Sequence, residues 1–170
     1  MTDRGMNGPD DDGDMLRLDR QVCFPIYAAS NMLNRLYRPV LAKLELTYPQ
    51  YLVMLVLWQD NPQSVGSLGN ALYLDSGTLT PLLKRMEQAG LITRTRDTMD
   101  ERRVAIGLTR KGHDLRARAL DVPATLAEGL HLSLEDAHIL RERVSALIAA
   151  LNGKAALPRS RAPSQAKREK

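Results

Sequence analysis

Apolar residues recur every three or four positions between residues 22 and 44, which is the spacing of one face of an α-helix. The stripe consists of Val22, Ile26, Ala29, Leu33, Leu36, Val40 and Leu44. It predicts a long amphipathic helix that Pro25 and Pro39 can bend. Because this helix can begin either near Asp19 or at Pro25, Cys23 lies in its first turn or just before it.

Three shorter helical segments follow. We expect a second helix over residues 48–60, ended by Pro62, a short third helix over residues 65–72, and a fourth that stops at Gly90. Each one follows a residue that favours the start of a helix, namely Thr47, Ser64, and Asp75 or Ser76.

The spacing of apolar residues then changes from every three or four positions, as in helices, to every second position, as in strands. The segments LITRTR and RVAIGL alternate between apolar and polar residues, and a charged DTMDE joins them, which predicts a two-stranded hairpin. Two further helices are expected after Thr109 and Ser133, with Pro123 kinking the first of them. The predicted domain is therefore mainly α, with a small β-hairpin.

The two ends of the chain differ from this region in composition. Residues 1–16 are rich in Gly and Asp, and residues 153–170 are rich in Pro, Ser and basic side chains; neither segment can bury enough apolar surface to order itself. We expect a disordered acidic leader, one folded domain over residues 17–152 and a disordered basic tail. Because the tail supplies more than the whole net charge of +4, that charge is only weak support for a polyanionic partner.

The chain has one cysteine, which cannot form an internal disulfide, and no signal segment precedes the domain. These features favour a reducing, cytoplasmic location. No apolar run approaches the ~20 residues of a membrane span, so we expect no membrane partner. The three histidines do not have metal-ligand spacing with the cysteine, and no Gly-rich phosphate loop follows a strand. We therefore expect no metal and no cofactor.

Two short helices, a tight turn and a hairpin follow one another in the order of a winged helix-turn-helix. Such a unit lays its second helix in the major groove of DNA and rests its hairpin on the backbone or in the minor groove. Ser76, Thr78 and Thr80 fall at the start of that helix, where base edges are contacted. Lys84 and Arg85 fall later, where phosphates are reached. The alternative is a helical domain whose hairpin only packs.

The hairpin and the following helix start read DERRVAIGLTRKG, and this stretch resembles the MarR family of transcription regulators. The family pattern D-x-R…L-T-x-x-G is matched by Asp100, Arg102, Leu108, Thr109 and Gly112. The resemblance implies a MarR-like dimer in which Arg102 enters the minor groove, Asp100 orients its guanidinium and Thr109 caps the next helix. A narrow minor groove concentrates the negative potential that attracts an inserted arginine. We count Arg103 among the DNA contacts as well.

Four longer segments are similar to the organic hydroperoxide resistance regulators, one branch of that family: CFPIYAAS, RLYRPVLAKL, TYPQYLVMLVLW and LYLDSGTLTPLLKRMEQAGLITR. The similarity covers roughly residues 17–151. It implies that Cys23 is a peroxide sensor and that Tyr37 and Tyr48 donate hydrogen bonds to it. Most of the branch also has a second, resolving cysteine, which this chain lacks.

A lone cysteine is more often a small buried hydrophobe, and a tyrosine more often packs at an interface. A thiol with a pKa of about 8.5 is only about 3% thiolate at pH 7, so a fast sensor needs partners that stabilise its charge. Cys23 and Tyr37 are fourteen residues apart, about 21 Å along one helix, so they cannot meet in one chain unless the helix breaks. Two such helices packed antiparallel about Ser30 would instead bring Cys23 beside Tyr37 of the partner subunit.

These patterns together predict a homodimeric repressor, not an enzyme, that binds a pseudo-palindromic operator in double-stranded DNA. An organic hydroperoxide would oxidise Cys23 and release the operator, and a low-molecular-weight thiol would form a mixed disulfide with Cys23. One alternative is a MarR-type repressor that responds to a reversible small ligand between its dimer helices and its DNA-binding lobe. Another is a one-cysteine thiol peroxidase, although the LDRQV before Cys23 lacks the Pro and Thr of peroxiredoxins.

Overall fold

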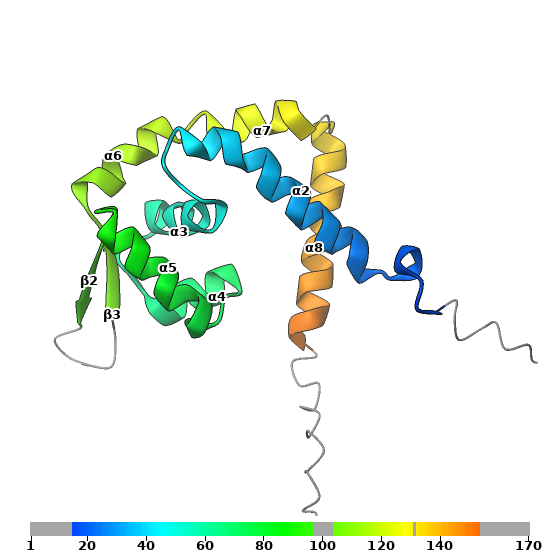
Figure 1. Ribbon diagram of the computed structural model, residues 1–170, viewed down its shortest axis with the longest axis horizontal. Helices are drawn as coiled ribbons and strands as arrows, with labels where there is room; N and C mark the ends of the chain where they lie inside the picture. The colour runs from blue at the N-terminus through cyan, green and yellow to red at the C-terminus, as the bar shows by residue number, and fades with distance from the viewer. Residues whose placement is uncertain (1–14, 97–103, 131, 154–170) are drawn as a thin grey trace, which may run out of the picture. The chain divides into compact units, whose positions relative to one another are not determined.

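The computed structural model describes residues 15–96, 104–130 and 132–153, and every structural statement below refers to these residues. The chain divides into two compact units, Met1–Gly129 and Leu130–Lys170. The elements, shown in Figure 1, are η1 (Leu18–Arg20), α2 (Cys23–Ala42), α3 (Tyr48–Gln59), β1 (Gln63–Ser64), α4 (Val65–Leu72), α5 (Ser76–Gln88), β2 (Ile92–Arg96), β3 (Val104–Leu108), α6 (Arg110–Arg118), α7 (Val122–Leu130) and α8 (Leu134–Gly153).

The first long helix, α2, begins at Cys23, with Val22 as its N-cap, and it runs without a break for 20 residues. Pro25 therefore lies in the first turn, where a missing backbone N–H costs little. Pro39 lies inside the helix. The start of α2 settles the position that the sequence left open, because Cys23 is the first residue of the helix.

The next three helices begin where local capping predicts. The Thr47 backbone N–H donates to the side-chain oxygen of Gln50 at 2.8 Å, and Ser64 Oγ accepts the N–H of Ser67 at 3.0 Å. Asp75, rather than Ser76, caps α5. Gly90 follows the end of that helix with φ of +70°, a conformation that glycine adopts without strain.

Within the described residues the sheet has three strands in the order β1-β3-β2, all antiparallel. The prediction of a two-stranded hairpin is correct for β2 and β3, which pair from Ile92 with Leu108 to Arg96 with Val104. It missed β1, which pairs through Gln63 with Ile106. Two residues are too few to show the alternation that identifies a strand in a sequence.

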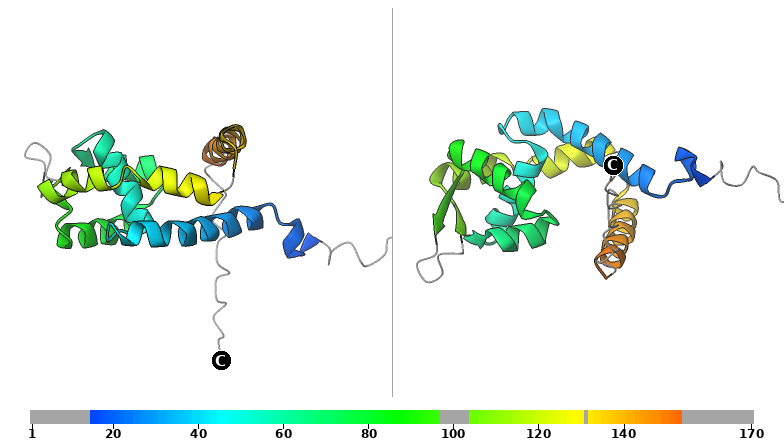
Figure 2. Two further views of the ribbon diagram at one scale, coloured as in Figure 1. Left: turned by 90° about the horizontal axis from the view of Figure 1, so that it is seen from above. Right: turned by 60° about the horizontal axis from the view of Figure 1, so that its bottom comes forward.

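The helical segment after the hairpin also differs from its prediction. Instead of one helix kinked at Pro123, the chain forms α6 and then α7, which begins at Val122. Pro123 is thus in the first turn of a new helix, which is the position where proline is best tolerated. Helix α7 runs beside α2 (Figure 2), and a Cβ on Gly129 would lie 3.0 Å from the side chain of Leu36.

The core gathers the end of α2, helices α3 to α7 and the base of the hairpin. Its largest fully buried side chains are Leu41, Val53, Met54, Leu57, Leu68, Leu79, Leu83, Met86, Ile92 and Ile106. In contrast, α8 has no buried residue, and the first half of α2 exposes Ile26, Tyr27 and Met32. None of the described helices is both long enough and apolar enough to cross a bilayer.

Candidate nucleic-acid interface and redox site

Helix α5 is held against the core by one face. Its buried residues are Leu79, Leu82, Leu83 and Met86. The turn from α4 is tight, since a Cβ on Gly69 would lie 2.9 Å from the carbonyl oxygen of Leu74, and Tyr73 adopts a φ of +54°. The angle between α4 and α5 is therefore set by close backbone contact, and the opposite face of α5 remains in solvent.

The five α5 residues predicted to contact DNA all lie on this solvent face. They are Ser76, Thr78, Thr80, Lys84 and Arg85, and each is exposed. The Thr78 backbone N–H donates to Asp75 Oδ1 at 2.9 Å, and its hydroxyl donates to Asp75 Oδ2 at 2.9 Å. These two hydrogen bonds hold the pKa of the Asp75 carboxyl below its usual value. Asp75 thus caps the helix, and the Thr78 hydroxyl is hydrogen-bonded to the capping carboxylate.

The tip of the hairpin, with the predicted DNA contacts Asp100, Arg102 and Arg103, lies outside the described residues. The base of the hairpin is described, and it is tied to its surroundings. Arg94 of β2 forms an ion pair with Glu87 of α5 at 3.6 Å. The Leu108 backbone N–H donates to Asn61 Oδ1 at 2.8 Å. These contacts, which the sequence did not reveal, join the base of the hairpin to α5 and to the loop that follows α3.

The junction between β3 and α6 is closely packed. Thr109 Oγ1 donates to the carbonyl oxygen of Gly90 at 2.6 Å and accepts the N–H of Gly112 at 3.1 Å. It therefore caps α6 and also binds the turn after α5. A Cβ on Gly112 would lie 2.2 Å from the carbonyl oxygen of Leu91, so only glycine fits there.

Gly112→Ala should lower the free energy of unfolding by about 1–3 kcal/mol, because the methyl group must displace the Leu91 backbone. Urea denaturation followed by circular dichroism measures this loss. Gly66→Ala is the matched control, since the nearest atom to its Cβ is Ser64 Oγ at 3.9 Å and alanine favours the helix. Equal stability of Gly112→Ala and the parent protein would contradict the close contact.

The residues of the predicted sensor lie at the two ends of α2. Cys23 is exposed and is the first residue of the helix. Tyr37, fourteen residues further along, packs against Tyr48 of α3 with ring centroids 4.3 Å apart. Since α2 is unbroken, the structure brings the two tyrosines together and keeps Cys23 about 21 Å from Tyr37 along the helix.

The tyrosine pair belongs to a larger aromatic cluster that the sequence reasoning did not identify. The ring of Tyr51 lies 6.1 Å from that of Tyr37, and the ring of Trp58 lies 6.3 Å from that of Tyr51. Burial, followed by the neighbouring phenols of Tyr48 and Tyr51, raises the pKa of Tyr37 to about 12. A phenol with this pKa stays protonated at neutral pH and can donate a hydrogen bond to a thiolate.

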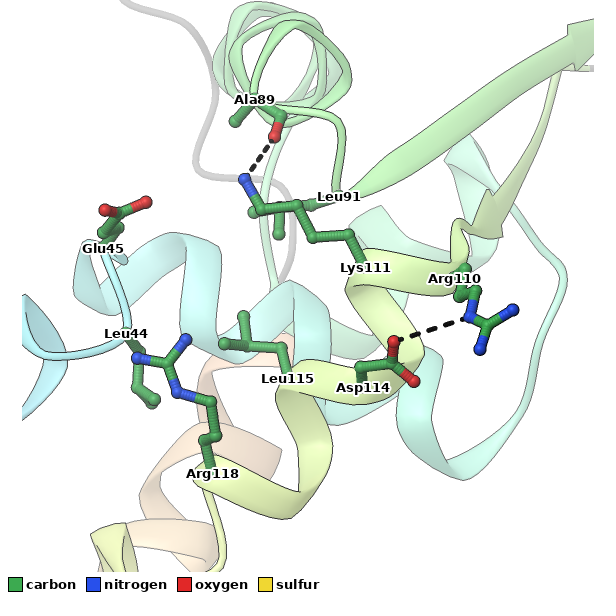
Figure 3. A pocket seen from close by; sticks show the side chains of 9 residues that line it. All are labelled: Leu44, Glu45, Ala89, Leu91, Arg110, Lys111, Asp114, Leu115 and Arg118. Carbon is green, nitrogen blue, oxygen red and sulfur yellow. Dashed lines mark hydrogen bonds and ion pairs between the residues drawn. The ribbon is translucent and has the colours of Figure 1, made fainter.

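A pocket of about 440 Å³ opens between the end of α2, the end of α5 and α6 (Figure 3). Its apolar lining is formed by Leu44, Leu91 and Leu115. Lys111 Nζ donates to the Ala89 carbonyl oxygen at 3.0 Å, and Arg118 donates to the Lys43 carbonyl oxygen at 2.6 Å. Among the described residues, no cluster of His, Cys, Asp or Glu side chains is placed to hold a metal ion.

Solved structures with this fold are winged-helix regulators. The structure of reduced AbfR bound to DNA matches with a TM-score of 0.68 and 33% sequence identity, over 83% of this chain and 99% of that one. Wild-type MarR from E. coli matches with a TM-score of 0.57 and 21% identity, over 75% and 96% of the two chains. The fold class predicted from the sequence, a mainly α winged helix-turn-helix, is therefore confirmed.

Sequence comparison identifies the family. A family model described as "Transcriptional regulator SarA/Rot" matches residues 35–118. The organic hydroperoxide resistance transcriptional regulator of Bacillus subtilis (strain 168) is 49% identical over 79% of this chain and 89% of its own length. The regulator TtmR of Methylorubrum extorquens (strain PA1) is 46% identical over 81% and 71%. The chain belongs to the MarR/SarA-type family of transcriptional regulators, in the organic hydroperoxide resistance branch.

Proposed function

We propose that the protein is a repressor that binds a pseudo-palindromic operator as a homodimer. Helix α5 enters the major groove with Ser76 and Thr80 toward the bases, while Lys84 and Arg85 contact phosphates. Asp100, Arg102 and Arg103 belong to the hairpin that reaches the minor groove. The support for this arrangement is the division of α5 into one face of buried leucines and one exposed polar and basic face.

The proposed dimer would cover the apolar faces that the single chain leaves exposed. On α2 and its N-cap these include Val22, Ile26, Tyr27 and Met32, and on α8 they include Ile139, Leu140, Val144 and Leu147. Two amphipathic helices with exposed apolar side chains are typical of an interface between copies of one chain. A two-fold axis near Ser30 packs the two copies of α2 antiparallel.

The observation that carries the sensing proposal is the length of α2. The helix is continuous and has Cys23 at its first residue and the Tyr37–Tyr48 pair near its other end. In the antiparallel dimer, the Cys23 thiolate of one subunit lies beside Tyr37 and Tyr48 of the partner subunit. Two phenolic hydroxyls and the helix N-terminus, all of which can donate hydrogen bonds, then face the Cys23 sulfur in the proposed dimer.

The proposed reaction is one oxidation followed by one exchange. The Cys23 thiolate attacks the distal oxygen of an organic hydroperoxide, the S–O bond forms and the O–O bond breaks. The leaving alkoxide takes up the proton that the thiol lost and departs as an alcohol, which leaves Cys23 as a sulfenic acid. A low-molecular-weight thiol then displaces the sulfenic hydroxyl as water and forms a mixed disulfide.

One equivalent of organic hydroperoxide should release the operator from the parent protein and leave Cys23→Ser bound to it. Fluorescence anisotropy measures the release, using a duplex that the reduced protein selects from a randomised pool. Intact mass on the same samples reports the oxidation state of the cysteine. Release of Cys23→Ser by the same hydroperoxide would contradict a sensor based on this thiol.

The second candidate function is regulation by a reversible ligand, and the pocket in Figure 3 favours it. Its volume of about 440 Å³ is within the usual range of small-molecule sites. It lies next to the Ala89 and Leu91 backbone that joins α5 to the hairpin, so an occupant there would shift both DNA-contacting elements. A small ligand that releases parent protein and Cys23→Ser equally would establish this function in place of thiol oxidation.

A further inference from the structure

The aromatic cluster runs along one face of α3. Tyr48, Tyr51, Leu55 and Trp58 are spaced by three or four residues, so they lie on the same side of this 12-residue helix. Tyr48 and Tyr51 lie at the start of α3 and meet Tyr37, whereas Trp58 lies at its end, one residue before Gln59. The cluster therefore spans α3 from the proposed sensor to the opposite end of the helix.

At that end, α3 is bonded to the first turn of α6, the helix that follows β3. The indole Nε1–H of Trp58 donates to the carbonyl oxygen of Gly112 at 2.9 Å, and this bond joins residues 54 positions apart in the chain. Gly112 in turn contacts the Leu91 backbone so closely that no Cβ fits between them. Because Leu91 directly precedes β2, any displacement of Gly112 must be shared by the start of the hairpin.

The same junction is bonded to the end of α5. Lys111, beside Gly112, donates to the Ala89 carbonyl oxygen at 3.0 Å. Thr109 donates to the Gly90 carbonyl oxygen at 2.6 Å. The Trp58 hydrogen bond thus reaches a junction whose contacts join the end of α5, the residue that precedes β2 and the start of α6.

We propose that Trp58 is the positioning residue that couples the tyrosine cluster to the hairpin and α5. The inference rests on the proposed function and names the side chain through which the sensor acts on the DNA-contacting elements. A thiol adduct on Cys23 of the partner subunit presses against Tyr37 and Tyr48 and moves the start of α3. The short helix then moves as a rigid body. The indole hydrogen bond carries that displacement to Gly112, and the close contact with Leu91 passes it on.

The first test is a double-mutant cycle read by the operator affinity of the reduced protein, so it needs no oxidant. Tyr37→Leu disturbs the cluster, and Trp58→Phe keeps an aromatic ring while removing the indole N–H. Tyr37→Leu should lower operator affinity about tenfold when Trp58 is present and less than about threefold in the Trp58→Phe background. Equal losses in the two backgrounds would overturn the proposal.

Leu55→Met is the matched control for this cycle. Leu55 lies on the same face of α3 and is also half-buried, but its side chain has no hydrogen-bond donor. In the Leu55→Met background, Tyr37→Leu should still lower affinity about tenfold. If Leu55→Met removes the coupling as fully as Trp58→Phe does, packing along α3 carries it and the specific role of Trp58 is wrong.

The second test measures the fluorescence of Trp58 itself, because Trp58 is the only tryptophan of the chain. Its emission maximum should shift when Cys23 carries a thiol adduct, and it should not shift in Cys23→Ser under the same treatment. Operator release without any change in Trp58 emission would overturn the proposal. If hydroperoxide and thiol release no operator, the sensing function has failed, while the cycle without oxidant still decides the coupling.

Discussion

Hydroperoxide followed by a low-molecular-weight thiol should leave one thiol adduct on Cys23 of each chain and lower operator affinity by about 100-fold. A sulfenic acid adds one oxygen atom, whereas the adduct must force apart the packing around Tyr37 and Tyr48 of the partner subunit. Release should therefore be more complete with the adduct than with peroxide alone. Intact mass and anisotropy on the same sample measure both effects, and a strong reductant should restore binding.

Peroxide without added thiol should give no crosslink between subunits. In an antiparallel pair of α2 helices centred near Ser30, the two copies of Cys23 are held about 20 Å apart, whereas a disulfide requires a Cα separation of about 4.4–6.8 Å. Non-reducing gels test this, with Cys23→Ser as the control that cannot crosslink. A dominant Cys23-linked dimer band would show that the proposed register of the two helices is wrong.

Arg102→Ala should weaken operator binding by about 1–3 kcal/mol, because it removes the side chain proposed to enter the minor groove. Lys84→Ala, at an exposed position of α5, should instead lower affinity evenly across sequences and reduce the salt slope by about one unit. Anisotropy titrations on the selected duplex and on an unrelated duplex, at several salt concentrations, separate the two effects. Operator affinity unchanged by Arg102→Ala would contradict the assignment of the hairpin to the minor groove.

Only part of the candidate site could be predicted from the sequence. The family resemblance singled out Cys23, Tyr37 and Tyr48, and the spacing along one helix showed that the first two cannot meet within a chain. The sequence did not show that Tyr51 and Trp58 extend the tyrosine pair along α3, since aromatic residues at helical spacing usually belong to a core. It also did not show the ion pair of Arg94 with Glu87, because long charged side chains usually lie in solvent.

The sequence by itself determined the elements whose signals are local. Thr47, Ser64 and Thr109 each mark a helix start, and Asp75 or Ser76 marks another, because a cap needs only a partner about three residues away. The apolar stripe of α2 and the alternation of β2 and β3 are likewise repeated along continuous segments. Local capping and periodicity were therefore sufficient for the mainly α fold with a hairpin.

Only the tertiary structure decided which distant segments meet. Strand β1 forms because Gln63 and Ser64 pair with β3, which is distant in the sequence. Two residues are too few to show any periodicity of their own. The bond from Trp58 to Gly112 and the contact of Gly112 with Leu91 join three separate elements. Such contacts depend on how the buried faces of α3, α6 and the hairpin pack together, and packing is a property of the assembled core rather than of any one segment.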